Sequence, residues 1–130
     1  MKKIINLIMM MCLCCYAYSQ NVEYKSNYIS SSESIGNNLT SSTSNAVETS
    51  IFFNYRDSIV VVNSANKKRA YWIVRCYEDL KDYVDVTDNI SNYTFTFLYN
   101  KYGVTDVLLM EERQGTTYIV DFSVYRTIKK

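Results

Sequence analysis

Hydrophobic and polar residues alternate along the last forty residues of the chain, a pattern typical of strands that bury one face. One such run has an aromatic residue at every second position, namely Tyr93, Phe95, Phe97 and Tyr99. Asn100–Gly103 then predicts a turn, Val104–Glu111 a returning strand, and Glu112–Gly115 a second turn. The final strand carries its apolar residues on a single face, namely Tyr118, Val120, Phe122 and Val124. Three strands joined by short turns predict an antiparallel meander whose apolar face needs a cover.

The middle of the chain has the same β character. A turn separates the alternating segment Ile51–Tyr55 from Ile59–Val62, a β-branched run typical of a buried strand. We expect a polar hairpin loop over 63–69 and then a strand over Ala70–Tyr77. A helix over 69–84 is the alternative, because one set of apolar residues also recurs there at helical spacing. These residues are Ala70, Ile73, Val74, Tyr77, Leu80 and Val84.

The N-terminal part is rich in small polar residues. Sixteen of the 25 residues in Ser26–Ser50 are Ser, Thr or Asn, which favour loops and turns. Val22–Ile29 predicts a short strand, and 30–48 predicts either a mobile surface segment or a weakly marked strand pair. We therefore divide the chain after the first 19 residues into a partly looped segment, 20–50, and an antiparallel β core, 51–130.

The fold class that follows is all-β. The pattern predicts a single small antiparallel β-sandwich or partly closed barrel of about seven or eight strands, ending in the meander. A short helix around 69–84 is the one exception left open.

Residues 1–19 resemble a secretory signal peptide in their layout. Lys2 and Lys3 precede the apolar stretch Ile4–Cys15, and small residues stand before a candidate cleavage site after Ser19. The stretch is shorter than the roughly 20 apolar residues that span a bilayer. We expect a secreted or periplasmic protein. The alternative is a lipoprotein at the cell envelope, anchored to the membrane through one leader cysteine, namely Cys12, Cys14 or Cys15.

Charge and cysteine content exclude several classes of protein. Of 14 Lys and Arg, two lie in the leader, so the remainder carries a net charge of about −1 against 13 Asp and Glu. A near-neutral chain has no general affinity for nucleic acid, and Lys67-Lys68-Arg69 is best interpreted as a solvated turn. Past the leader Cys76 is alone, so no internal disulfide can form, and we expect its thiol to be buried on a strand.

Few residues here suggest catalysis or metal binding. The chain has no histidine, which removes Ser-His-Asp, Cys-His and imidazole-metal sites, and its three glycines form no phosphate loop. Five acids lie within eleven residues, namely Glu78, Asp79, Asp82, Asp85 and Asp88. Their spacing does not match an EF-hand, so a solvated acidic turn is the favoured interpretation and weak Ca²⁺ binding the alternative. We assign no catalytic, cofactor or metal residues.

Tyrosine is the residue type that points to a binding role. Eleven of the 13 tyrosines lie beyond the leader, and tyrosine and tryptophan suit half-exposed faces that bind proteins or sugars. We expect a non-catalytic exported β domain that binds an envelope, protein or glycan partner through an aromatic sheet face. The alternatives are a lipocalin-like carrier of a small ligand and a hydrolase that uses two carboxylates. The residues that we predict for the binding surface are Tyr71, Trp72, Tyr77, Tyr83, Tyr93, Tyr99 and Tyr102.

Overall fold

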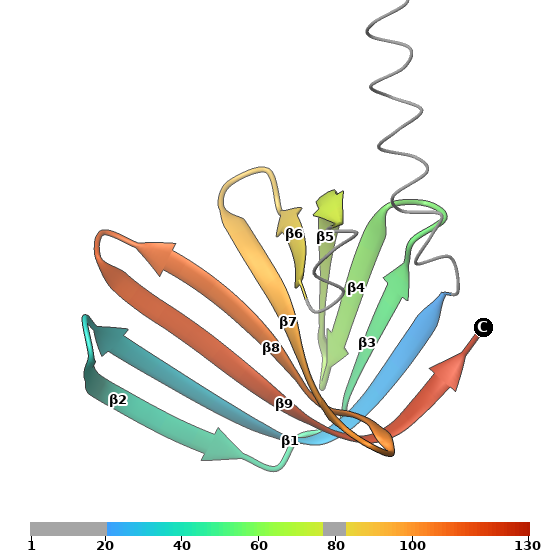
Figure 1. The fold of residues 1–130 in the computed structure, drawn as a ribbon, viewed down its shortest axis with the longest axis horizontal. Coiled ribbons are helices and arrows are strands. Elements are labelled where there is room, and N and C mark those ends of the chain that lie inside the picture. Colours follow the sequence, from blue (N-terminus) through green and yellow to red (C-terminus); the bar gives the residue numbers. More distant parts are fainter. Residues whose placement is uncertain (1–20, 77–82) are drawn as a thin grey trace, which may run out of the picture.

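The protein is an antiparallel β-barrel, as Figure 1 shows for the computed structural model, which describes residues 21–76 and 83–130. The predicted all-β fold class is confirmed: eight strands close the barrel and one more strand extends it. No helix in the described ranges is long and apolar enough to cross a membrane. The strands are β1 (Val22–Ile35), β2 (Asn38–Asn45), β3 (Thr49–Asn54), β4 (Ile59–Ser64), β5 (Lys67–Cys76), β6 (Tyr83–Thr87), β7 (Asn92–Asn100), β8 (Gly103–Arg113) and β9 (Thr116–Lys129).

Strand β1 closes the barrel and also carries the extra strand. It pairs with β9 along its whole length, from Val22 opposite Lys129 to Ile35 opposite Thr116. On its other side it pairs first with β3 and then, from Ile29 onward, with β2. Strands β2 and β3 therefore lie end to end along β1. In Figure 1 the β1–β2 and β8–β9 hairpins reach out together on one side of the molecule.

Bulges at the centre of β1 let this strand change partner. The register with β9 shifts between Lys25 and Ser26 and again between Ser26 and Tyr28. Bulges bend a strand and increase its twist, which a long strand needs in order to follow a closing sheet. The Ser26 side chain is fully buried, and its hydroxyl donates to the Tyr28 carbonyl (3.1 Å) and accepts from the Tyr28 N–H (3.4 Å). The backbone of the bulge thus provides hydrogen-bond partners for the buried Ser26 hydroxyl.

Aromatic side chains fill the centre of the barrel. Phe53 and Phe95 are fully buried and meet edge to face, with ring centroids 5.2 Å apart. Tyr24 and Phe97 also pack on Phe53, at 5.7 Å and 5.2 Å. An eight-stranded barrel is narrow enough for side chains to fill it. The predicted apolar alternation of β7 is confirmed for Phe95 and Phe97, which face this core, whereas Tyr99 at the end of the strand is exposed.

The alternative prediction of a helix over 69–84 is wrong for the part of that segment that the structure describes. Residues 69–76 belong to β5, which pairs with β4 and β6, and Tyr83 begins β6. A bulge between Ile73 and Arg75 makes Val74 an extra residue, so that Cys76 faces the core. After the bulge, the residues that face the core shift by one position, so the apolar residues no longer alternate strictly. This is why they also fit a helical spacing. Residues 77–82, with Tyr77, lie outside the described residues.

Two other sequence predictions change in detail. The hairpin loop expected over 63–69 is shorter, because β4 continues to Ser64 and β5 begins at Lys67. For 30–48 the strand pair is the correct alternative, formed by β1 and β2. The leader, residues 1–19, lies outside the described residues.

Candidate functional site

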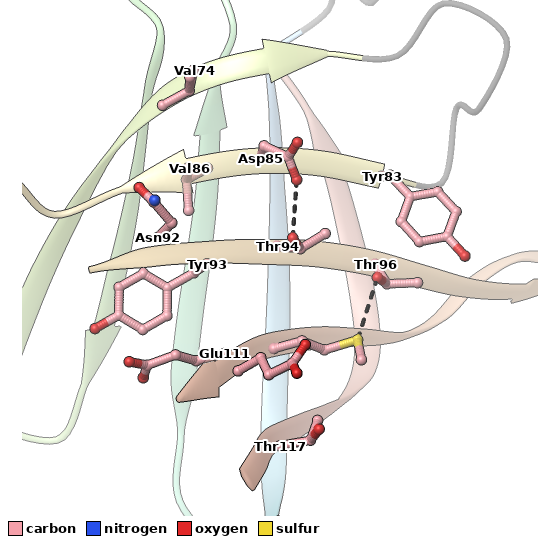
Figure 2. A pocket seen from close by; sticks show the side chains of 12 residues that line it. Val74, Tyr83, Asp85, Val86, Asn92, Tyr93, Thr94, Thr96, Glu111 and Thr117 are labelled. Atoms are coloured by element: carbon pink, nitrogen blue, oxygen red, sulfur yellow. Dashed lines mark hydrogen bonds between the residues drawn. The ribbon is translucent and has the colours of Figure 1, made fainter. Parts of the chain in front are cut away.

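An open groove of about 860 Å³ lies across β5 to β9. Figure 2 shows its floor, with β7 in the middle and the side chains of neighbouring strands on both sides. Its volume is within the range of ordinary ligand pockets. The lining residues are Val74, Tyr83, Asp85, Val86, Asn92, Tyr93, Thr94, Thr96, Met110, Glu111, Glu112 and Thr117.

The outward residues of β6, β7 and β8 make a polar floor. On β7, Thr94 and Thr96 alternate with the buried Phe95 and Phe97, so their hydroxyls face away from the core. Thr94 lies opposite Asp85 in the ladder and donates a hydrogen bond to its Oδ1 (2.9 Å). The Thr96 hydroxyl lies 3.7 Å from the thioether sulfur of Met110 on β8. Figure 2 marks this contact with a dashed line. The floor therefore offers hydroxyl and carboxylate groups in one row.

The groove reaches the point where β7 and β8 separate. The ladder between these strands ends at Thr94 opposite Met110, so the preceding residues of β7 have no ladder partner on β8. Tyr93 and Glu111 line the resulting fork, one from each strand. Tyr93 also packs edge to face on Tyr71, with centroids 5.2 Å apart, so that core packing fixes its ring.

Hydrogen bonds hold the Tyr93 ring in place at its outer end. Its hydroxyl donates to Asp88 Oδ2 (3.1 Å), and Asp88 Oδ1 accepts from the N–H groups of Ile90 (2.9 Å) and Ser91 (2.7 Å). These backbone donors lower the pKa of Asp88, first Ser91 and then Ile90. Burial, followed by the hydrogen bond to Asp88, raises the pKa of Tyr93. The tyrosine is therefore a neutral donor and ring surface at neutral pH.

Glu111 is held by an arginine at the end of the same strand. Arg113 Nη2 lies 2.6 Å from Glu111 Oε1, and Arg113 Nε donates to the same oxygen (2.9 Å). The guanidinium also lies over the Tyr118 ring, 5.6 Å from its centroid. The hydrogen bond and charge of Glu111 raise the pKa of Arg113. Only one carboxylate oxygen takes part in these bonds, so Oε2 can still accept a hydrogen bond from a ligand.

The predicted aromatic surface divides into three parts. Tyr71 is buried in the core, at 2% exposure, and so presents no binding surface; the prediction is wrong for this residue. Tyr83 and Tyr93 line the groove from β6 and β7. The remaining described members are exposed on the surface but outside the groove lining, namely Trp72, Tyr99 and Tyr102. Of the six predicted residues that the structure describes, it thus places two in the groove lining; Tyr77 lies outside the described residues.

The acidic cluster contributes one residue to the groove. Asp85 lines it, whereas Asp88 holds the turn between β6 and β7; Glu78, Asp79 and Asp82 fall outside the described residues. Within the described ranges, no three His, Cys, Asp or Glu side chains come close enough to hold a metal ion. Cys76 is buried, as expected, and lies on β5.

Several groove residues were not singled out from the sequence. Thr94 and Thr96 could have been found, because each alternates with a core phenylalanine and must face outward. Asn92, Glu111 and Glu112 carried no such signal, since their place in the groove depends on where two strands part.

Comparison of the chain with models of protein families, with curated proteins and with solved structures finds no match. The functional argument therefore depends on the site itself.

Proposed function

We propose that the protein is a non-catalytic, exported glycan-binding domain whose ligand occupies the groove across β5 to β9. The observation that carries this proposal is the combination of tyrosine rings with hydroxyl, amide and carboxylate groups in one open groove. Sugars present C–H faces that pack on aromatic rings and hydroxyls that bond to such polar groups. Export depends on the predicted leader, 1–19, and is part of the proposal.

The outward face of β6 and β7 suits an extended ligand. Tyr83 pairs with Thr96 in the ladder and shares this face with Asp85 and Thr94, as in Figure 2. Tyr93 alternates with Thr94 and so lies on the core side of β7, where it lines the groove at the fork between β7 and β8. A short oligosaccharide can pack on the Tyr83 ring while its hydroxyls bond to the floor.

The charge of the groove selects among glycans. Asp85, Glu111 and Glu112 all line it; Arg113 is paired with Glu111, and Arg75 lies opposite Asp85 in the ladder. Like charges disfavour an acidic sugar at such a site. We therefore expect neutral or amino sugars to bind and uronic acids to be rejected.

Titration calorimetry tests the proposal with soluble cello-, xylo-, malto- and chito-oligosaccharides, and with oligogalacturonate as the acidic probe. Tyr83→Ala removes a 40% exposed ring from the groove and should weaken binding about tenfold. Tyr102→Ala removes an 85% exposed ring that does not line the groove and should leave binding unchanged. Absence of millimolar binding to all four neutral and amino probes would contradict the proposal, as would an equal loss in both variants.

A carboxylate-based hydrolase is the second candidate, because the groove holds three acidic side chains. Hydrolysis by two carboxylates requires them to face each other across a sugar. The same oligosaccharides, incubated with the protein and assayed for new reducing ends, distinguish the candidates. Turnover that Asp85→Asn abolishes would favour the hydrolase.

The lipocalin-like carrier has less support. Its ligand would need the space inside the barrel that Phe53, Phe95 and Phe97 occupy at the centre. None of these three phenylalanines is among the residues that line the groove.

A further inference from the structure

Strand β2 has a free backbone edge. Among the described strands, it is the one that pairs on a single side, with β1, whereas the other eight have neighbours on both sides. All eight residues of Asn38–Asn45 are exposed. The unpaired N–H and C=O groups along such an edge form a template for another strand.

Of the usual protections of an edge strand, this edge has only a bulge. Natural edge strands carry lysine or proline, are very short, or are covered by another element. Asn38–Asn45 contains no charged residue and no proline. It does contain one bulge, because Glu33 lies opposite Ser41 and Ser34 opposite Leu39, which leaves Thr40 as an extra residue. Beyond the bulge, Ser41–Asn45 is regular and open to pairing.

We propose that β2 pairs with β2 of a second copy of this chain, antiparallel and edge to edge. An uncharged strand can pair with itself without the like-charge repulsion that opposes most self-pairing. A partner chosen by opposite charge would need charges on β2, and this strand has none. The second copy is therefore the occupant that the chemistry of the edge favours.

The register follows from the length of the regular stretch. Pairing that uses all of Ser41–Asn45 places the two-fold axis at Thr43, so that Ser42 lies opposite Ser44 of the other copy. Serine and threonine hydroxyls facing each other across strands form hydrogen bonds, as Ser30 and Ser44 already do within this chain (3.4 Å). The stretch is short, so the dimer is weak and forms only as concentration rises.

Self-pairing leaves the groove accessible. None of the residues that line the groove lies on β2, so a dimer presents two grooves. Two grooves on one particle can engage a repetitive polymer at once, which raises the apparent affinity for it without a new contact. The dimer itself does not depend on the proposed glycan binding.

Sedimentation velocity from micromolar to millimolar protein tests the proposal. We expect a monomer–dimer equilibrium whose Kd rises about fivefold or more in Thr43→Lys, because the two-fold axis brings the new charges together. Ile90→Lys adds the same charge at a 91% exposed position in the β6–β7 turn and should leave the Kd unchanged. A monomer at every concentration, or an equal effect of both substitutions, overturns the proposal.

Amide hydrogen exchange gives a readout that does not depend on a folded variant. In the wild-type protein, alternate amides of Ser41–Asn45 point away from β1 and should exchange more slowly as concentration rises. The same rates in dilute and concentrated protein would count against pairing at β2, even if a dimer forms elsewhere.

Discussion

Glu23 should stabilise the fold in a pH-dependent way. Its side chain lies on the outside of β1, yet the residue is only 8% exposed. Oε1 accepts a hydrogen bond from Ser50 (2.6 Å) and lies 2.9 Å from Lys25 Nζ, while Oε2 lies 2.9 Å from Lys130 Nζ. The Ser50 hydroxyl, Lys130 and Lys25, in that order, lower the pKa of Glu23 to about 2, and burial opposes them. The group ties β1 to β3 and to the C-terminal end of the chain.

The size of the effect follows from the pKa. A fall from 4.5 to about 2 corresponds to roughly 3 kcal/mol of unfolding free energy, at about 1.4 kcal/mol per pKa unit. Lys25 and Lys130 are partly exposed, so solvent screening reduces this to about 2 kcal/mol. Because the pKa is lowered in the folded state, the stabilisation is complete above pH 4.5 and is lost as the pH falls toward 2.

Urea unfolding of the wild type and Glu23→Gln at pH 7 and pH 3 measures this contribution. We expect the variant to be about 2 kcal/mol less stable at pH 7, with less than half of that difference left at pH 3. Glu33→Gln is the matched control on the same strand, because none of the ion pairs among the described residues involves Glu33. A difference of the same size at both pH values, or equal losses in the two variants, would refute the reasoning.

Three further substitutions test the core, the outer face and the β1 bulge. Phe53→Ala removes a fully buried ring that packs on Phe95 and should cost about 3–5 kcal/mol in urea unfolding; a loss below 1 kcal/mol would contradict the packing described. Burial, followed by the hydrogen bond and charge of Asp106, raises the pKa of Asp121 to about 6, so the wild type loses stability as the pH rises from about 4 to 6. Asp121→Asn should therefore be about 1 kcal/mol more stable than wild type at pH 7, after allowance for solvent screening, and show no gain at pH 3.5. Ser26→Ala should lower stability by about 1 kcal/mol in thermal unfolding, because the Tyr28 N–H and C=O at the bulge lose their hydrogen bonds to the Ser26 hydroxyl, and an unchanged midpoint would argue against those bonds.

Local alternation in the sequence is enough to predict most of the strands and their faces. Alternation is a local property, since successive side chains of a strand point to opposite sides whatever the strand pairs with. Phe95 and Phe97 could therefore be assigned to the core, and Phe122 with them, before any partner was known. The same rule shows that Thr94 and Thr96 face outward.

Tertiary structure decided where local alternation breaks. The bulge at Val74 exists because β5 must fit the register of β6, and it turns Cys76 toward the core. The strand pair in the Ser-rich N-terminal part carries little hydrophobic signal of its own. It forms because β1 gains a long ladder with β9, whose residues are almost a hundred positions away in the chain.

The groove and the free edge also belong to the tertiary structure. Tyr93 and Glu111 line the groove where the ladder between β7 and β8 has ended. Glu23 contacts Ser50 and Lys130 because β1 lies between β3 and β9. Periodicity shows which side of a strand is apolar, but it does not show which strand lies beside it or where a ladder stops. Those depend on backbone hydrogen bonds between distant segments, whose register is set by the closure of the whole barrel.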